Sequence, residues 1–424
     1  MEITPKLSVT EDKIRLLTVK TDMFKTACLT LNVLVPMGEY AAEYAVLSSY
    51  LVHSSKKYDS LIKLNSRLEE LYGALLSGSI SRHGENYRIQ LSITCIDDSL
   101  TFDGKSVTGA SLELLLSLLT KPSADENGFS TEIRLTAEDI ESEINDKRSY
   151  AMTRMLETMC ADEIYGLTKN EILENVKKVT PQSLLAAWKF MLKNGIIQLN
   201  AIGNISEDDC KKKLREAFSD VGERTPYEPE TVFVEEAEDL TELTEELTMN
   251  QSKLVLGFRG GMTDENDDFY SRRIMTDVFG GGPYSRLFMN VREKLSLCYY
   301  CSARLIRGKG IIVIQSGIEK ENRQKVLDEI NRQLDIMKNG EFSDEDFEAS
   351  KKAICDAYRS FNDTPDALDI YYGTQLTGDI VTPDEAIENF LAVTRDDVKK
   401  TACAFSLDTV YTLAGTDKED GADE

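Results

Sequence analysis

The stretch FGGGPYSRLFMNVREKLSLCYYCSARL, residues 279–305, decides how the rest of this sequence is interpreted. A glycine-rich turn precedes YSRLFMNVREK, whose apolar spacing predicts a helix, and CYYCSARLI then reads as a strand. The turn RGKG and the apolar strand IIVIQSGI follow. Residues 284–318 are therefore predicted to form a helix followed by a β-hairpin.

The same arrangement occurs in the first half of the chain. A helix is predicted over 59–72, with apolar residues on one stripe and Gly73 at the position of a C-cap. The segment SGSIS, the turn RHGE and the strand NYRIQLSITCI come after it. Another amphipathic helix is predicted just before, over 39–52. Both halves thus contain a helix and then a hairpin.

Three pairs of short segments recur in the same order. They are SRL at 66 and 285, TAEDIE at 136 against SDEDFE at 343, and VTPQ at 179 against VTRD at 393. The offsets of 219, 207 and 214 residues all lie close to half of the 424-residue chain. We infer a duplication. Thr136 and Ser343 are predicted to be the N-caps of long helices, each with an acid three residues later.

The expected fold class is α+β, because helices and strands do not alternate strictly. We predict two homologous α/β-sandwich domains, each a mostly antiparallel sheet with helices on one face. The N-terminal domain is placed at 1–222, an acidic linker at 223–240, and the C-terminal domain at 241–424. The linker is predicted because residues 225–252 contain nine acids and no Lys or Arg.

Composition excludes several kinds of partner. Asp and Glu total 74 against 49 Lys and Arg, a formal net charge of −25, which repels nucleic acid and anionic membranes. No apolar window approaches the ~18 residues of a membrane span. The first twenty residues lack a secretory apolar core. Eight scattered cysteines are expected to be free, mostly buried thiols, and the protein is expected to be cytoplasmic.

Few residues here could carry catalysis. The two histidines, His53 and His83, lie in polar, turn-like segments and are interpreted as surface residues. There is no GxSxG nucleophile motif. Cys298 and Cys301 form one isolated CxxC in a predicted strand. Side chains at i and i+3 of a strand face opposite ways, so these are expected to be core or edge thiols.

The 279–305 stretch resembles the second domain of insulinase/pitrilysin-type metallopeptidases, which include mitochondrial processing peptidase and bacterial relatives. These chains carry a glycine-rich turn, SRLF, an Arg-Glu-Lys run, and a Tyr seven residues after the Arg. The first half is also similar to the family at LNSRLEELYGALLSGSISRHGENY and at VTPQSLLAAWKFML…IGN. The resemblance covers nearly the whole chain. It implies two homologous domains facing each other in a clamshell.

Active members carry HxxEH on the first helix of the first domain. One turn of helix separates its histidines, so both imidazoles bind one zinc ion, and its glutamate activates water. The alignment puts Ala45, Ser48 and Ser49 where His, Glu and His belong, and Glu143 at the remaining ligand position. One carboxylate cannot hold zinc. The resemblance therefore implies a chain without a metal cofactor, with zinc only in a partner.

The family's substrate-binding Arg and Tyr fall on Arg292 and Tyr299. The resemblance implies that this chain is the non-catalytic subunit of a heterodimeric peptidase. An HxxEH-containing homologous subunit would hold the zinc and cleave peptides, and this chain would contribute Arg292 and Tyr299. A homodimer remains open. The alternative is a non-enzymatic structural or peptide-binding protein of the same fold, and a self-sufficient enzyme with an unrelated site has no motif in its favour.

Overall fold

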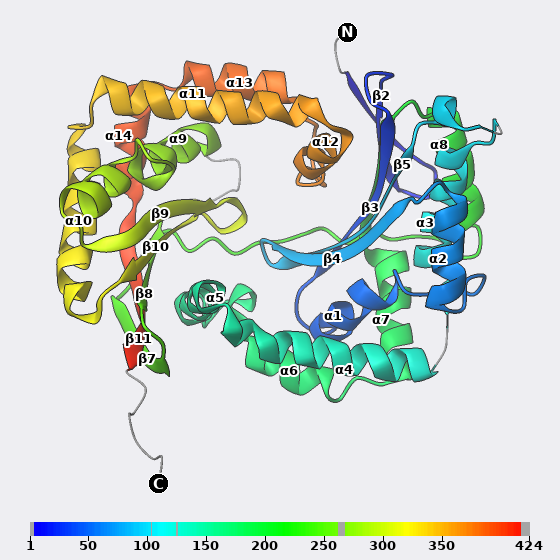
Figure 1. Cartoon of the computed structure of the whole chain (residues 1–424), viewed down its shortest axis with the longest axis horizontal. Helices are drawn as coiled ribbons and strands as arrows, with labels where there is room; N and C mark the ends of the chain where they lie inside the picture. The colour runs from blue at the N-terminus through cyan, green and yellow to red at the C-terminus, as the bar shows by residue number, and fades with distance from the viewer. Residues whose placement is uncertain (1–3, 103, 124–125, 262–267, 417–424) are drawn as a thin grey trace. The chain divides into compact units, whose positions relative to one another are not determined.

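A computed structural model describes residues 4–102, 104–123, 126–261 and 268–416 (Figure 1). Its contacts divide the chain into two compact units. The first is built from residues 1–141, 169–230 and 358–385, and the second from 142–168, 231–357 and 386–424. Among the described helices, none combines the length and apolar composition that a membrane span requires. Because each unit is assembled from three separate ranges, neither is one continuous stretch of sequence.

The first unit contains a six-stranded sheet in the order β1-β2-β6-β3-β5-β4. β2 and β6 run parallel, and the other neighbours are antiparallel. Its elements are β1 (Pro5–Val9), β2 (Arg15–Lys20), β3 (Thr26–Pro36), α1 (Ala41–Tyr50), α2 (Leu61–Glu70), β4 (Leu75–His83), β5 (Asn86–Ile96), α3 (Val107–Thr120), α4 (Glu126–Ser142), α6 (Lys169–Val176), α7 (Pro181–Asn194), β6 (Ile196–Gly203), α8 (Glu207–Phe218) and α12 (Pro365–Tyr372).

The second unit contains a five-stranded sheet in the order β7-β11-β8-β10-β9. β7 and β11 run parallel, and the remaining pairs are antiparallel. Its elements are α5 (Lys147–Met159), β7 (Thr241–Thr248), β8 (Ser252–Arg259), α9 (Phe269–Gly280), a π-helix (Phe288–Lys294), β9 (Cys298–Ile306), β10 (Ile311–Ile318), α10 (Arg323–Asn339), α11 (Asp344–Ser360), α13 (Pro383–Ala392), α14 (Arg395–Ala404) and β11 (Ser406–Thr416).

The two sheets have one topology. With β1 set aside, β2, β6, β3, β5 and β4 occupy the places of β7, β11, β8, β10 and β9, with the same pairing directions. α2 precedes β4 as the π-helix precedes β9, so the segments at Ser66 and Ser285 are topologically equivalent. Thr180 and Thr394 cap the equivalent helices α7 and α14, each in a capping box. The predicted α+β fold with two similar, mostly antiparallel sheets is confirmed.

One helix start was predicted wrongly. Ser343 does cap α11, since its hydroxyl accepts from the backbone N–H of Asp346 at 3.0 Å. Thr136, its counterpart, lies inside α4, which already begins at Glu126. Thr136 is 8% exposed, so its side chain packs rather than caps. Both sites have the sequence pattern of an N-cap, but only Ser343 stands immediately before the start of its helix. Thr136 has helical residues before it.

A helix from the first half of the sequence completes the second unit. α5 packs on β8, β10 and β11, where Met155 joins Val255, Val313 and Tyr411 in one buried cluster (Figure 1). At Gly257 a Cβ would come within 2.8 Å of the Met155 sulfur. A larger residue at this position would therefore force the methionine side chains of α5 to shift. Helices α9, α10 and α14 belong to the same unit, so α5 is an addition to the predicted helical layer.

A buried ionic cluster holds the end of α5. The Arg259 guanidinium donates to the Met159 carbonyl at 2.7 Å, to the Glu163 carboxylate at 2.8 Å and to the Asp408 carboxylate at 3.0 Å. The Lys309 ammonium also contacts Glu163. Because these charges are buried, each needs its partner, and the cluster connects the α5 end to β8 and β11.

The first unit in turn includes a helix from the second half of the sequence. α12, from the second half of the sequence, packs on β3 and β6 (Figure 1). The Asp369 carboxylate of α12 accepts from the Thr30 hydroxyl at 2.8 Å and from the Asn200 amide at 2.9 Å. Arg88 on β5 donates to the Gly373 carbonyl at 2.6 Å. Each half of the sequence thus contributes one helix to the sheet formed mainly by the other half.

The acidic stretch 223–240 contains no helix or strand, and both of its ends are bound. Near its start, the Arg224 side chain is 2% exposed and donates to backbone carbonyls of the first unit, at Asp12, Lys13, Leu192 and Gly195. Further on, the Val232 carbonyl accepts from Lys309 and the Glu235 carbonyl from the Gly261 N–H, both in the second unit. The boundaries 1–222 and 241–424 remain a prediction about the duplicated halves.

Truncating the α5 contact should destabilise the second unit. Met155→Ala removes a fully buried side chain, and Met→Ala changes in cores cost about 2–5 kcal/mol. We expect faster amide hydrogen exchange in β8 and β11. Met289→Ala is the control, because Met289 is 49% exposed in the same unit and should change stability by less than about 0.5 kcal/mol. Equal protection in both variants would contradict the role given to α5.

The buried carboxyl of α12 should make stability depend on pH. Burial raises the pKa of Asp369, against the opposing hydrogen bonds from Asn200 and Thr30. A raised folded-state pKa gives a stabilising contribution that is complete below about pH 4 and is lost as pH rises through the folded value. The unfolding free energy of the wild type should therefore fall, relative to that of Asp369→Asn, as pH rises from about 4 to 7. Urea titrations of both proteins test this, and a pH-independent difference would refute it.

Candidate functional site

Helix α1 presents no metal ligand at the positions of the family motif. Ala45 and Ser49 lie one turn apart on it, as the resemblance requires, but neither side chain is an imidazole. Ser48 is 4% exposed, and its hydroxyl donates to the Ala45 carbonyl oxygen at 2.8 Å. This bond within the helix satisfies the hydroxyl locally. The helix therefore offers packing and no acid, base or ligand at these three positions.

Glu143, the fourth position, has a local structural partner. It begins the short 3₁₀ turn after α4, and its carboxylate accepts from the Thr153 hydroxyl of α5 at 2.9 Å. Glu143 belongs to the second compact unit, whereas α1 belongs to the first. Within the described part of the chain, no group of three or more His, Cys, Asp and Glu side chains is arranged to hold a metal ion.

His53, interpreted from the sequence as a surface residue, is partly exposed and has a partner on another helix. It follows α1, and its Nδ1 lies 2.5 Å from the carboxylate of Glu132 on α4. The Glu132 side chain is 7% exposed and that of His53 is 37% exposed. The hydrogen bond to Glu132 raises the pKa of His53. Sequence reasoning missed Glu132, because it is one of 74 acids and nothing local distinguishes it.

Arg292 lies in the π-helix, where an α-helix was predicted from the sequence. The Leu295 N–H bonds to the Asn290 carbonyl, five residues back, and Ser296 at φ 52° ends the helix. π-Helical turns insert an extra residue and occur frequently at functional sites. The Arg292 guanidinium stacks on Phe288 at 4.5 Å and meets a Glu293 carboxylate at 3.7 Å. Its side chain is 41% exposed and is therefore accessible from solvent.

Tyr299 is the extra residue of a β-bulge. On β9, Tyr300 pairs with Gly317 of β10 and Cys298 pairs with Ile318, so Tyr299 has no partner of its own. β9 is the edge strand of its sheet. The bulge directs the Tyr299 side chain into solvent, where it is 67% exposed. Bulges at sheet edges commonly redirect one side chain in this way.

The bulge also corrects the prediction for the CxxC pair. Cys301 pairs with Ser316 and Cys298 with Ile318, two residues further along β10. Residues two apart on a strand face the same way, so the inserted Tyr299 brings both cysteines onto one face. Interaction with Cys301 lowers the pKa of Cys298, and the same interaction raises the pKa of Cys301. Opposite orientations were predicted because a regular strand was assumed, and nothing in the local sequence marks the bulge.

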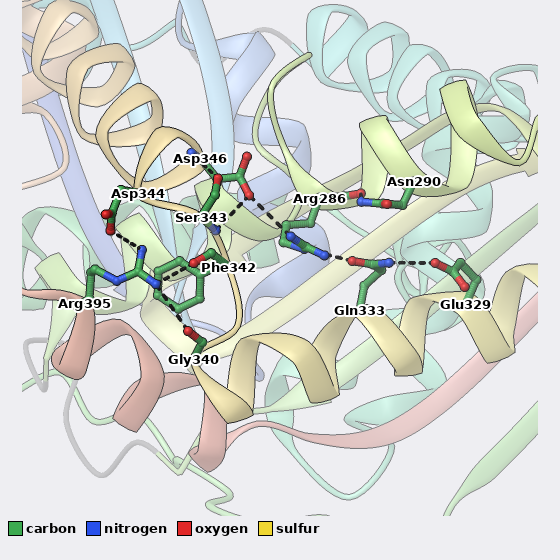
Figure 2. Close-up of polar contacts among 10 residues, drawn as sticks. All are labelled: Arg286, Asn290, Glu329, Gln333, Gly340, Phe342, Ser343, Asp344, Asp346 and Arg395. Atoms are coloured by element: carbon green, nitrogen blue, oxygen red, sulfur yellow. Dashed lines mark hydrogen bonds and ion pairs between the residues drawn. The ribbon is translucent and has the colours of Figure 1, made fainter.

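Arg286, six residues before Arg292, has a structural role. Figure 2 shows its guanidinium pointing to Gln333 on α10, to which it donates at 2.9 Å, while the Gln333 amide donates to Glu329 at 2.7 Å. The Asp346 carboxylate of α11 lies 3.4 Å away. The Arg286 side chain is only 15% exposed. Arg286 therefore ties the start of the π-helix to α10 and α11, and its donors are already used.

A second arginine in Figure 2 fixes the turn between those helices. Arg395 of α14 donates to the carbonyls of Gly340 and Phe342, and its guanidinium stacks on the Phe342 ring at 4.3 Å. It also pairs with Asp344 at 3.0 Å. These contacts fasten α10, α11 and α14 together. The π-helix and β9 are thereby carried on a rigid support.

Comparison with known proteins agrees with this geometry. A sequence profile described as "Peptidase M16 inactive domain" matches residues 178–354. The "Probable inactive metalloprotease YmfF" of Bacillus subtilis is 29% identical over 409 residues, which cover 94% of this chain and 95% of that protein.

Solved structures share the fold. A conserved protein from Enterococcus faecalis superposes with a TM-score of 0.86 at 24% identity, covering 98% of this chain and all of that one. A structure described as a peptidase M16 inactive domain, from Pseudomonas fluorescens, has a TM-score of 0.78 at 14% identity and covers 99% of this chain. Together these matches support the resemblance to the insulinase/pitrilysin-type, or M16, peptidase family, and the sequence lacks that family's HxxEH zinc motif.

Proposed function

We propose that this protein is the zinc-less subunit of a two-subunit M16 peptidase and contributes Arg292 and Tyr299 to peptide binding. The observation that carries the proposal is the bulge in β9. It projects the Tyr299 phenol from a sheet edge, beside a π-helix whose last turn holds an exposed arginine. Arg292 acts electrostatically on Cys298, the neighbour of Tyr299, so both side chains lie at the same end of β9.

Both groups suit a peptide backbone. The phenol can donate one hydrogen bond and the guanidinium several, and peptide carbonyl oxygens are acceptors. In a hydrolysis reaction the same donors would stabilise the oxyanion that develops at the scissile carbonyl. The outer side of β9 adds unpaired backbone groups to which an extended peptide can pair. Hydrolysis of the peptide bond also requires a zinc ion that activates water, and we assign that zinc ion to an HxxEH-containing partner.

A protein that binds peptides without cleaving them is the second candidate. β4, the edge strand of the first sheet, supports it. A Cβ at Gly78 of β4 would lie 2.6 Å from the Ser48 carbonyl oxygen of α1. Helix α1, which carries the positions of the missing zinc motif, therefore packs directly against the edge strand β4. Such an edge can hold an extended peptide by main-chain hydrogen bonds in the absence of any metal.

The binding role predicts a defined loss of activity. The chain is to be reconstituted with an HxxEH chain encoded beside it, and peptide cleavage measured. Tyr299→Phe deletes one donor and should lower kcat by about 10²–10³, as expected for loss of an oxyanion donor. Arg292→Ala should in addition raise KM, because a charged hydrogen bond to the peptide is lost. Assembly, measured by size-exclusion chromatography, should be unchanged.

Two controls match these variants. Tyr300→Phe alters the next phenol, whose ring instead packs against Arg148 at 4.4 Å. Lys325→Ala removes one exposed positive charge from α10. Arg286→Ala is unsuitable, since Arg286 holds Gln333 and its loss would disturb the support. Cleavage that falls equally in the control variants, or not at all in the site variants, would refute the role.

The chain itself should hold no stoichiometric zinc. Ala45 and Ser49 replace both imidazoles, and a carboxylate alone does not retain zinc. Metal analysis of the purified protein after exposure to zinc should give far less than one ion per chain, and a chelator should leave its thermal stability unchanged. One zinc ion per chain that is lost in Glu143→Gln would overturn this expectation.

A further inference from the structure

We propose that Cys298 and Cys301 form a reversible dithiol–disulfide pair that controls the bulge presenting Tyr299. In a regular strand, residues i and i+3 are about 10 Å apart, at ~3.3 Å per residue. Disulfides require Cα atoms closer than about 7 Å. A regular β9 could therefore never cross-link these two residues.

The bulge removes that obstacle. The partners of the two cysteines on β10, Ser316 and Ile318, are only two residues apart. Cys298 and Cys301 accordingly occupy neighbouring places on one face, about 6.6 Å apart at two strand repeats. This separation lies within the Cα distance that a disulfide allows. The register with β10 also places the two thiols on the same face of the strand.

The two thiols are chemically unequal. Cys298 is half-buried, whereas Cys301 is 4% exposed. The hydrogen bond from Cys301 lowers the pKa of Cys298 to about 7, and the nearby Arg292 guanidinium lowers it further by its charge. The same hydrogen bond, followed by burial, raises the pKa of Cys301. Cys298 is thus the attacking thiolate, and Cys301 is the resolving thiol that needs no access to solvent.

The oxidant we assign is a low-molecular-weight disulfide of the glutathione type. The Cys298 thiolate attacks one of its sulfurs, a mixed disulfide forms, and the first thiolate leaves. Cys301 then loses its proton and attacks the Cys298 sulfur, which forms the internal disulfide and expels the second thiolate. The two cysteines are oxidised, one small disulfide is reduced to two thiols, and the two cysteine protons pass to them. Excess small thiol reverses both steps.

The cross-link would span the bulge on both sides of Tyr299. It closes a loop of which Tyr299 and Tyr300 are the only inner residues, and it removes the thiolate that faces Arg292. Oxidation should therefore alter how both side chains are presented to a peptide. This consequence rests on the proposed function, whereas formation of the disulfide does not.

The test uses the full-length protein alone, equilibrated in buffers of defined reduced-to-oxidised glutathione ratio. Free thiols are blocked with one alkylating reagent, the protein is unfolded and reduced, and newly released thiols are labelled with a second reagent for peptide mass spectrometry. We expect Cys298 and Cys301 to be released together, at a mass 2 Da below the dithiol form before reduction. The exposed Cys403 is the internal control and should not pair.

Variants sharpen the test. Cys298→Ser should abolish modification of Cys301, whereas Cys301→Ser should trap the mixed disulfide on Cys298. Cys403→Ser should leave the pair intact. Glutathione on Cys298 in the wild type without an internal bond, or no oxidation at any ratio, would overturn the proposal. If the disulfide forms but leaves peptide cleavage by the assembled complex unchanged, the thiol pair stands and its control of Tyr299 fails.

Discussion

Both sheets depend on a helix that comes from the other half of the sequence. α5 covers Val255, Val313 and Tyr411 in the second unit, and α12 covers β3 and β6 in the first. The central strands β3 and β8 are buried along nearly their whole length, so both faces of each sheet are covered there. Each exchanged helix supplies part of that cover. Folding of each unit requires a segment distant in sequence.

Polar groups make these two contacts specific. Arg259 donates to the Met159 carbonyl at the end of α5, to Glu163 just beyond it and to Asp408 of β11. Asp369 of α12 accepts from Thr30 and Asn200. A buried charge or amide tolerates only an arrangement that satisfies it, whereas apolar surfaces can slide. The clusters therefore set the register of helix on sheet. Such precision matters here, because β8 and β11 lie in the same sheet as the β9 edge.

At that edge, two irregularities convert ordinary elements into a candidate binding surface. The π-helix carries Arg292, and the bulge carries Tyr299 and turns Cys298 towards Cys301. Arg286 and Arg395 hold the helices behind them (Figure 2). In α1, by contrast, the hydroxyl of Ser48 is bonded within its own helix, and the positions of the family's zinc ligands are filled by small side chains.

The sequence alone determined the duplication, the helix-and-hairpin order, the family and the missing imidazoles. The duplication and the element order follow from apolar periodicity and short repeated segments, the family from the resemblance of residues 279–305, and the missing imidazoles from the presence of only two histidines. All of these are local properties. Tertiary structure decided the rest. Thr136 is not an N-cap because its helix begins earlier in the sequence. His53 contacts Glu132 on another helix. Helices α5 and α12 pack on sheets formed by residues distant in sequence. The bulge at Tyr299 likewise depends on register with β10. Periodicity records which face of an element is apolar, but not which distant partner covers it or where pairing slips by one residue.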